Sequence, residues 1–323
     1  MNNSPLISNC TAEAIRNAAL ALKDGHLVAF PTETVYGLGA DARNPEAVKR
    51  IYEVKGRPSG HPLIVHISSI NQLDKWAEEI PEYAIELARA FWPGPMTLIL
   101  KRTEIAKNFI TGGQDTVGLR VPSDPMALAL IQEFEKMSDS AIAAPSANRF
   151  GQVSPTAGSD VLEELGEFLL DSDKILDGGN SSIGIESTII DCVGKIPIIL
   201  RPGFVTVEDI EEVLGISIKS ASHSPVLKFS GSFEKHYAPI CRVIIEDTAI
   251  EGAGYLAMFN IPTPDGMHRL ASPNTEEEFA RVLYSTFRRA DHLRLGFLVV
   301  SLPQAQGIGI AIRERLEKAS QGR

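Results

Sequence analysis

Hydrophobic and polar positions in the first two thirds of the chain alternate between helical and strand spacing. Residues 11–25 carry one apolar stripe, with Thr11 placed to cap its start and Gly25 to end it, which predicts an amphipathic helix. Further helices are predicted over residues 44–56, 70–91 and 206–214. Short apolar runs between turn residues predict buried strands at residues 27–30, 63–67, 96–100, 117–121, 141–144, 187–191 and 198–200.

The pattern changes between residues 220 and 239, where Ser, Gly and Pro accumulate as in a linker. Beyond it the alternation restarts, with strands predicted at 241–246, 255–259 and 296–300 and helices at 275–290 and 308–319. Strands that alternate with helices are typical of an α/β fold. We therefore predict a large α/β domain over residues 1–215, a linker over 216–239 and a small α/β domain over 240–323.

Composition narrows the class of function. The 323 residues carry a formal net charge of -10, whereas sequence-independent binding along a duplex needs a broad basic surface. The three cysteines and seven histidines show no metal-ligand spacing, so we predict no protein metal site and reduced thiols in the cytoplasm. The N-terminus has no signal-peptide pattern, and the longest apolar runs are strand-length, so no membrane span is expected.

Two turns far apart in the sequence carry complementary chemistry. Lys55-Gly56-Arg57-Pro58 holds two cations in a rigid turn, and Pro145-Ser146-Ala147-Asn148 holds two short hydrogen-bonding side chains. If the fold brings the turns together, the cations would neutralise phosphate oxygens while Ser146 and Asn148 fix orientation. Taken alone, Lys55 and Arg57 also fit a solvated pair at a helix end, where the helix dipole favours cations.

Three further features have two interpretations each. The run from Pro31 to Gly39 follows a strand. Its polar side chains could form a site in which the glycines let the backbone approach a ligand closely, or the glycines could simply make turns. His66 lies among apolar strand residues, which is typical of a hydrogen-bonded core histidine. Arg120 lies in an apolar strand and therefore needs an anionic partner, either a structural acid or a ligand.

Nucleophilic and single-loop nucleotide sites are not indicated. Ser146 has no Gly-x-Ser-x-Gly elbow around it, and the chain has no Walker-type loop. Any nucleotide would therefore be held by elements that are separated in the sequence.

The ordered series of motifs resembles the YrdC-like threonylcarbamoyl-AMP synthase family, in its longer form with a C-terminal extension. The match over about residues 10–215 rests on Pro31-Thr32-Glu33-Thr34-Val35-Tyr36-Gly37-Leu38, Lys55-Gly56-Arg57-Pro58, Pro62-Leu63-Ile64-Val65-His66, Trp92-Pro93-Gly94-Pro95-Met96-Thr97, Gly118-Leu119-Arg120-Val121-Pro122, Pro145-Ser146-Ala147-Asn148, Ser154-Pro155-Thr156, Glu186-Ser187-Thr188-Ile189 and Arg201-Pro202-Gly203. Beyond it, His236-Tyr237-Ala238-Pro239 resembles the family's linker motif, and Gly307-Ile308-Gly309-Ile310-Ala311 with Arg315-Leu316 resembles the end of the second domain. The chain departs from the family pattern at Ser230, where Pro usually precedes Gly, and at His61, where Asn is frequent.

The resemblance implies a fold and a reaction. The fold would be a twisted, largely parallel YrdC-like sheet followed by a Rossmann-like extension. L-threonine, bicarbonate and ATP would give threonylcarbamoyl-AMP and pyrophosphate, with Mg²⁺ bound to ATP. The product would pass to the machinery that makes N6-threonylcarbamoyladenosine beside the anticodon of tRNA, with at most weak RNA contact by this chain.

The resemblance also implies residue roles. Catalytic residues would be Lys55, Arg57, Ser146 and Asn148. Threonine would be held by Thr34, His66, Arg120 and Ser187, with Arg120 on its carboxylate. The nucleotide would contact Arg57, His61, Ser146, Ser154, Arg201 and Tyr237, so that the linker folds back over the cleft as a gate.

Two alternatives stay open at this stage. One is a non-catalytic RNA-binding or ribosome-maturation module on the same concave face, against which the acidic charge and the complete set of substrate residues argue. The other is a domain that makes adenylates from carbamoyl phosphate, although such proteins usually carry zinc-finger and transferase regions that this sequence lacks.

Overall fold

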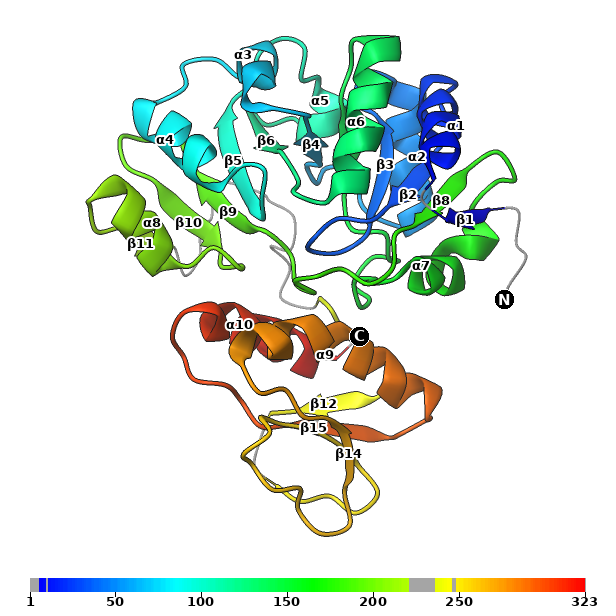
Figure 1. The fold of residues 1–323 in the computed structure, drawn as a ribbon, viewed down its shortest axis with the longest axis vertical. Helices are drawn as coiled ribbons and strands as arrows, with labels where there is room; N and C mark the ends of the chain where they lie inside the picture. Colours follow the sequence, from blue (N-terminus) through cyan, green and yellow to red (C-terminus); the bar gives the residue numbers. More distant parts are fainter. Residues whose placement is uncertain (1–5, 10, 221–235, 246–247, 323) are drawn as a thin grey trace.

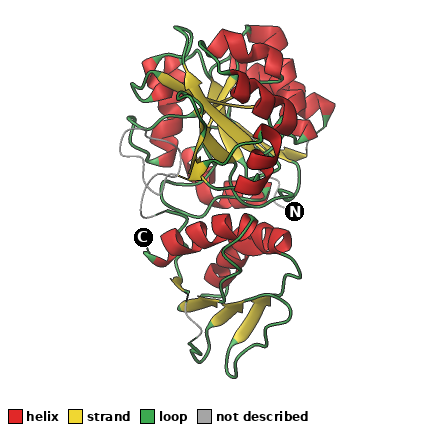
Figure 2. Cartoon of the chain, turned by 90° about the vertical axis from the view of Figure 1, so that its left-hand side faces the viewer, coloured by secondary structure: helices red, strands yellow, loops and turns green. Residues whose placement is uncertain are grey.

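The computed structural model describes residues 6–9, 11–220, 236–245 and 248–322. The predicted linker over 216–239 therefore lies largely outside the described residues, and so do Ser230 and Cys10. The chain forms two α/β bodies, each built on its own sheet (Figure 1). Helices flank the larger sheet, and those of the smaller body lie on the side of its sheet that faces the larger one (Figure 2). The predicted α/β class is confirmed.

The larger sheet runs in the order β1-β8-β2-β3-β7-β4-β6-β5-β9-β10-β11. Its strands are β1 Ile7–Asn9, β2 Val28–Phe30, β3 Gly37–Asp41, β4 Ile64–His66, β5 Met96–Lys101, β6 Thr116–Arg120, β7 Ile142–Ala144, β8 Lys174–Asp177, β9 Thr188–Asp191, β10 Ile198–Arg201 and β11 Lys219–Ser220. Its helices are α1 Ala12–Lys23, α2 Pro45–Lys55, α3 Leu73–Trp76, α4 Glu82–Phe91, α5 Asn108–Thr111, α6 Pro125–Ser138, α7 Gly158–Leu165 and α8 Val207–Leu214.

The expectation of a largely parallel sheet is wrong for the larger body. The pairs β2/β3, β3/β7, β4/β7, β5/β6 and β9/β10 are antiparallel, which is as many as the parallel pairs β1/β8, β2/β8, β4/β6, β5/β9 and β10/β11. One cause is strand β3, which the sequence pattern did not reveal because its glycines suggested a turn. Gly39 is required for packing, since a Cβ there would lie 2.7 Å from a methyl carbon of Ile142.

The smaller sheet has the order β12-β15-β13-β14, and all its pairings are parallel. Its strands are β12 Arg242–Ile244, β13 Gly254–Leu256, β14 His268–Ala271 and β15 Phe297–Val300, and its helices are α9 Glu276–His292 and α10 Ile308–Ser320. Both helices lie between this sheet and the larger body (Figure 1). The second domain therefore faces the first with helices.

Local sequence explains how helix α2 positions its two cations. The Asn44 side chain accepts hydrogen bonds from the backbone N–H groups of Glu46 and Ala47, which caps the helix start. Gly56 ends the helix in the left-handed region at φ 61°, a conformation that glycine adopts without steric cost. Lys55 thus occupies the last helical turn and Arg57 the turn beyond it.

Strand register positions a second pair of site residues. His66 at the end of β4 pairs with Arg120 at the end of the parallel strand β6. Paired residues on neighbouring strands point to the same face of a sheet. Their side chains therefore leave the sheet side by side at its carboxyl edge.

The two described cysteines and the lengths of the helices bear on the predictions about thiols and membrane spans. Cys192 and Cys241 are buried and form no disulfide. Among the described residues, no helix is both long and apolar enough to cross a membrane.

Candidate active site

A small cavity lies where the strand ends of the larger sheet meet the end of the linker. Its volume is about 40 Å³. Its walls are formed by Thr32, Thr34, Val35, Tyr36, Gly37, Ile64, His66, Arg120, Ala144, Pro145, Ser146, Glu186, Ser187, Arg201, His236 and Tyr237. All four residues predicted to hold threonine line it, together with Ser146, Arg201 and Tyr237 from the predicted nucleotide set.

Arg120 is the centre of one wall. Its Nη2 donates to Glu33 Oε1 at 2.6 Å and to Thr34 Oγ1 at 3.0 Å, and both charged side chains are about 95% buried. Thr32 donates to the carbonyl of Val35, which leaves Thr34 to donate to Thr32 across their 2.9 Å contact. Arg120 therefore has the structural acid that its apolar strand required. Its Nε is buried with no protein partner, which leaves a donor for an anionic ligand.

A second wall joins Ser187 to Arg201. The Arg201 guanidinium donates to the Ser187 carbonyl at 3.1 and 2.8 Å and to Ser187 Oγ at 3.1 Å. Ser187 Oγ also lies 2.8 Å from Thr97 Oγ1. The hydroxyl is thereby fixed in the cavity wall by side chains from two other strands, β5 and β10.

The structure brings the two distant turns together. Lys55 Nζ donates to the carbonyl oxygens of Ser146, at 2.6 Å, and of Asn148. Ser146 in turn donates to the amide oxygen of Asn148 at 2.5 Å. Burial first, and Arg57 second, hold the pKa of Lys55 well below its ordinary value. Two N–H donors of Lys55 therefore shape this turn.

Arg57 lies close by and is also buried. Its Nη2 donates to the Pro62 carbonyl at 3.1 Å, while its Nε has no protein partner. Burial lowers its pKa to about 10, an effect that Tyr52 and Tyr237 oppose. A buried guanidinium with an unused donor favours an anionic ligand.

Five predicted residues do not line the cavity: Lys55, Arg57, His61, Asn148 and Ser154. Lys55 and Asn148 lie directly behind Ser146. Ser154 is fully buried and donates to Glu186 Oε1 at 2.6 Å, so it reaches the cavity only through that carboxylate. The backbone carbonyl of His61 accepts a hydrogen bond from Tyr52 at 2.8 Å.

Glu186 is an acidic wall residue to which sequence reasoning assigned no role. Its carboxylate accepts from Tyr284 of α9 and is paired with Arg315 of α10, at 2.9 and 3.2 Å respectively. A signal for Arg315 was present in the sequence, because it occupies the apolar stripe of its helix with Ile308, Ile312 and Leu316. A buried arginine needs an acid, which is the argument already applied to Arg120.

Two linker residues close the cavity. His236 and Tyr237 are both buried, and Tyr237 adopts a positive φ of 63°, which is uncommon for a tyrosine. The Tyr237 ring stacks on Tyr284 at 5.7 Å between centroids, and its hydroxyl has no protein partner. The linker end therefore packs against the second domain while it fills space beside the site.

Histidines 66 and 236 are uncharged at neutral pH. Burial lowers the pKa of each to about 3, reinforced by Arg120 at His66 and by Lys55 and Arg57 at His236. Both remain neutral when folded but take up protons near the ordinary value of 6.5 when unfolded. Their contribution to stability is thus complete above pH 6.5 and is lost progressively as the pH falls toward 3.

Acidification should therefore destabilise the protein through these two residues. Between pH 7 and pH 5, each should lower the free energy of unfolding by about 2 kcal/mol. Urea unfolding at the two pH values measures the loss. In the His66→Asn variant, the unfolding free energy should fall between the two pH values by about 2 kcal/mol less than in the parent. An equal fall in variant and parent would contradict the assignment to His66.

Two family models together match most of the chain. The model described as "Telomere recombination" matches residues 20–203, and the model described as "Threonylcarbamoyl-AMP synthase, C-terminal domain" matches residues 205–321.

Similar proteins cover nearly the full length. A threonylcarbamoyl-AMP synthase of Pyrococcus abyssi is 42% identical over 95% of this chain and 94% of its own length. One from Bacillus subtilis is 39% identical over 96% and 93%. The crystal structure of P. abyssi Sua5 complexed with L-threonine superposes with a TM-score of 0.87 at 38% identity, covering 98% of this chain and 96% of that one.

Proposed function

This chain belongs to the threonylcarbamoyl-AMP synthase family in its longer, two-domain form, and from that we propose that it makes threonylcarbamoyl-AMP and pyrophosphate from L-threonine, bicarbonate and ATP. It is an enzyme whose relatives are named for an AMP-linked product. One observation carries the finer proposal: a single cavity gathers Thr34, His66, Arg120 and Ser187 beside Ser146, Arg201 and Tyr237. An amino-acid site and a nucleotide site would therefore adjoin.

Threonine would bind at the Arg120 wall. The unused Nε of Arg120 suits the carboxylate, because charge-assisted hydrogen bonds to carboxylates are strong. Ser187 and neutral His66 would complete the contacts. The P. abyssi protein crystallised with L-threonine supports this choice of amino acid for a similar chain.

In this reaction the substrate supplies the nucleophile, so the main contribution of the protein would be to stabilise negative charge. The threonine nitrogen adds to bicarbonate, and loss of water leaves a carbamate. A carbamate oxygen then forms a bond to the α-phosphorus of ATP as the bond to pyrophosphate breaks. Lys55 and Arg57 would stabilise the negative charge on the phosphoryl oxygens and the leaving group, while Ser146 and Asn148 hold the nucleotide in line.

Mg²⁺ would arrive with ATP. Among the residues that the structure describes, no cluster of three or more His, Cys, Asp or Glu side chains could hold a metal. Glu186, which lines the cavity, is paired with Arg315, and Glu33 is paired with Arg120 of the cavity wall. The residues present therefore fit an ion held mainly by phosphate oxygens, where it neutralises charge on the polyphosphate.

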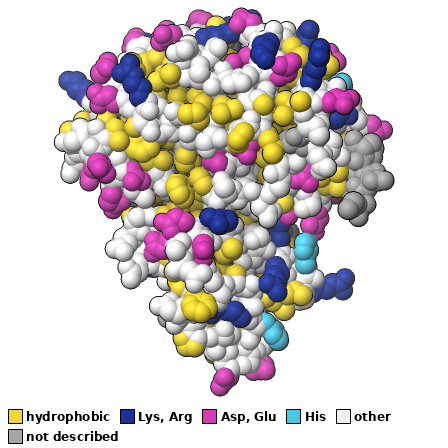
Figure 3. Space-filling view, viewed as in Figure 1, with side chains coloured by type: hydrophobic (Ala, Val, Ile, Leu, Met, Phe, Trp, Pro, Cys, Tyr) yellow, Lys and Arg dark blue, Asp and Glu magenta, His cyan; other side chains and the backbone are white. Residues whose placement is uncertain are grey.

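The product would serve N6-threonylcarbamoylation of tRNA next to the anticodon, through a separate transferase. Acidic and basic side chains are interspersed over the face in Figure 3, without one continuous basic surface. This distribution supports a role in supplying the adenylate, with at most weak RNA contact.

The proposed reaction is tested by pyrophosphate release from ATP, with and without L-threonine and bicarbonate. Release that needs both substrates supports the synthase. Release that ignores threonine overturns it, and dependence on carbamoyl phosphate would indicate the related adenylate chemistry. RNA binding without any turnover would favour a non-catalytic module.

The linker end would act as a gate. Ligand pockets usually offer about 300–1,000 Å³, far more than the 40 Å³ found here, so His236 and Tyr237 must withdraw before ATP enters. On reclosing they would shield the labile product from water.

Removing the Tyr237 ring should disturb this gate. In Tyr237→Ala we expect turnover to fall and the released adenylate to hydrolyse sooner, since the ring stacked on Tyr284 is lost. Pyrophosphate release and the lifetime of the adenylate, followed by chromatography, measure both effects. If neither changes, the gate is abandoned.

A further inference from the structure

The two domains meet at the active-site wall through one carboxylate. Glu186 lies directly before Ser187 and lines the cavity. Its oxygens accept from Ser154 at 2.6 Å, from Tyr284 at 3.1 and 2.9 Å, and from Arg315 Nε at 3.2 Å. Tyr284 and Arg315 belong to helices α9 and α10 of the second domain and are fully buried. The second domain thus supplies most of the donors to a residue of the cavity wall.

The contacts of Glu186 exclude some roles. Both oxygens are already engaged, so few acceptor sites remain for a ligand. Burial alone would raise its pKa, but Arg315 and Arg201 keep it below the ordinary value. A carboxylate with a low pKa and several bound donors is a poor proton acceptor. Its function must lie in what it holds in place.

Arg315 also forms a hydrogen bond to the segment that carries Arg201. Its Nη1 donates to the carbonyl of Pro202 at 2.6 Å, one residue beyond Arg201. Arg201 in turn binds the carbonyl and hydroxyl of Ser187. One side chain of α10 therefore fixes both segments, 186–187 and 201–202, whose relative position sets the Ser187 hydroxyl.

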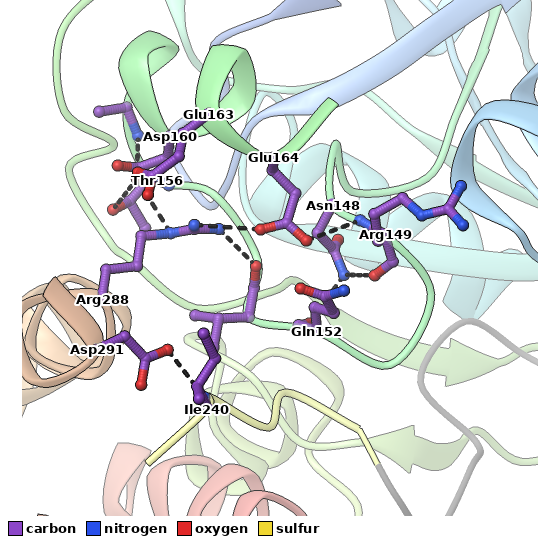
Figure 4. A network of polar contacts seen from close by, with 12 residues as sticks. Asn148, Arg149, Gln152, Thr156, Asp160, Glu163, Glu164, Ile240, Arg288 and Asp291 are labelled. Carbon is purple, nitrogen blue, oxygen red and sulfur yellow. Dashed lines mark hydrogen bonds and ion pairs between the residues drawn. The ribbon is translucent and has the colours of Figure 1, made fainter. Parts of the chain in front are cut away.

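Other contacts between the domains lie away from the cavity. Figure 4 shows Arg288 of α9 reaching Glu164, at 3.3 Å, and Asp160, at 3.6 Å, in the larger body. His292 pairs with Glu163 at an exposed position. These contacts attach the domains to each other away from the cavity, whereas Tyr284 and Arg315 contact Glu186, a residue that lines it.

We propose that Tyr284 and Arg315 are positioning residues that act through Glu186 to hold Ser187 and Arg201 in the geometry that binds L-threonine. The second domain is then part of the threonine site and not only a cover. The identity of the ligand rests on the proposed function above. The effect passes through the hydrogen bonds of the buried Glu186 carboxylate. Removing one donor to it, the hydroxyl oxygen of Tyr284, therefore tests the proposal.

The test uses the full chain and the Tyr284→Phe variant, which deletes the hydroxyl and keeps the ring that Tyr237 stacks on. Calorimetry should show L-threonine binding weakened about tenfold, the cost of one lost hydrogen bond to a charged group. The KM for threonine should rise by the same factor while kcat changes less than about threefold. Two controls should bind like the parent: Tyr255→Phe, the same deletion in β13, and His292→Gln, which removes an interdomain contact elsewhere.

A double-variant comparison identifies the route. Glu186→Gln should weaken threonine binding by a similar factor, and the double variant with Tyr284→Phe should bind no worse than the weaker single variant. Additive losses, or unchanged affinity in Tyr284→Phe, would overturn the positioning role. Failure of the parent protein to release pyrophosphate in a threonine-dependent way would instead defeat the proposed function, because binding is measured separately.

Discussion

Replacing Lys55 by methionine should lower kcat for threonine-dependent pyrophosphate release by about a thousandfold, at the upper end of what one preorganised donor contributes. Lys55 has one role in the proposed reaction and one in the fold. In the proposed reaction it stabilises charge on the phosphoryl group, and in the structure its Nζ donates to the carbonyls of Ser146 and Asn148. Methionine keeps the length of the side chain and removes every donor. Both the charge and the geometry of the Ser146–Asn148 turn are then lost.

The matched control is Lys49→Met on the same helix. That side chain is 67% exposed and pairs with Glu53 at the surface, so kcat should stay at the parent value. Steady-state pyrophosphate release measures both variants, and circular dichroism confirms that each is folded. A folded Lys55→Met protein that retains most of its kcat would remove Lys55 from the catalytic set.

Replacing Arg120 by methionine should both destabilise the protein and weaken threonine binding. Glu33 would be left as a buried carboxylate without its partner, which typically costs about 3–5 kcal/mol of unfolding free energy. Affinity for L-threonine should fall about 100-fold, because the charged donor for its carboxylate is gone. Urea unfolding and calorimetry measure the two effects.

A double variant separates stability from binding. Glu33→Gln combined with Arg120→Met removes both charges, so most of the lost stability should return. Threonine affinity should not return, because the Arg120 guanidinium proposed to bind the threonine carboxylate is still missing. Recovery of both properties together would mean that Arg120 serves only as the partner of Glu33.

Local sequence predicted the elements that carry the site. Capping by Thr11 and the apolar runs of β4 to β7 follow from neighbouring residues. The juxtaposition of the Lys55 and Ser146 turns is also confirmed. This inference rested on chemistry, because the cations of one turn and the hydrogen-bonding side chains of the other could bind the same phosphate-containing ligand.

Long-range partners were not predictable in the same way. Arg315 meets Glu186 across 129 positions of the chain, and periodicity indicates that a residue is buried without indicating against what. The antiparallel pairs of the large sheet were missed for a related reason, because strand order depends on contacts that no local pattern encodes. Strand β3 was missed because Gly37 and Gly39 have the composition of a turn.

The linker end at the cavity has a thermodynamic consequence. His236 and Tyr237 belong to the same molecule as the cavity they line, so in the proposed gate they compete with substrate as an intramolecular ligand. Dilution cannot remove such a competitor, and the affinity of the full chain equals its intrinsic affinity multiplied by the fraction of molecules in which the site is vacated. If the linker end is the gate proposed above, the interactions that hold Tyr237 against Tyr284 help to set the ATP concentration that the proposed reaction needs.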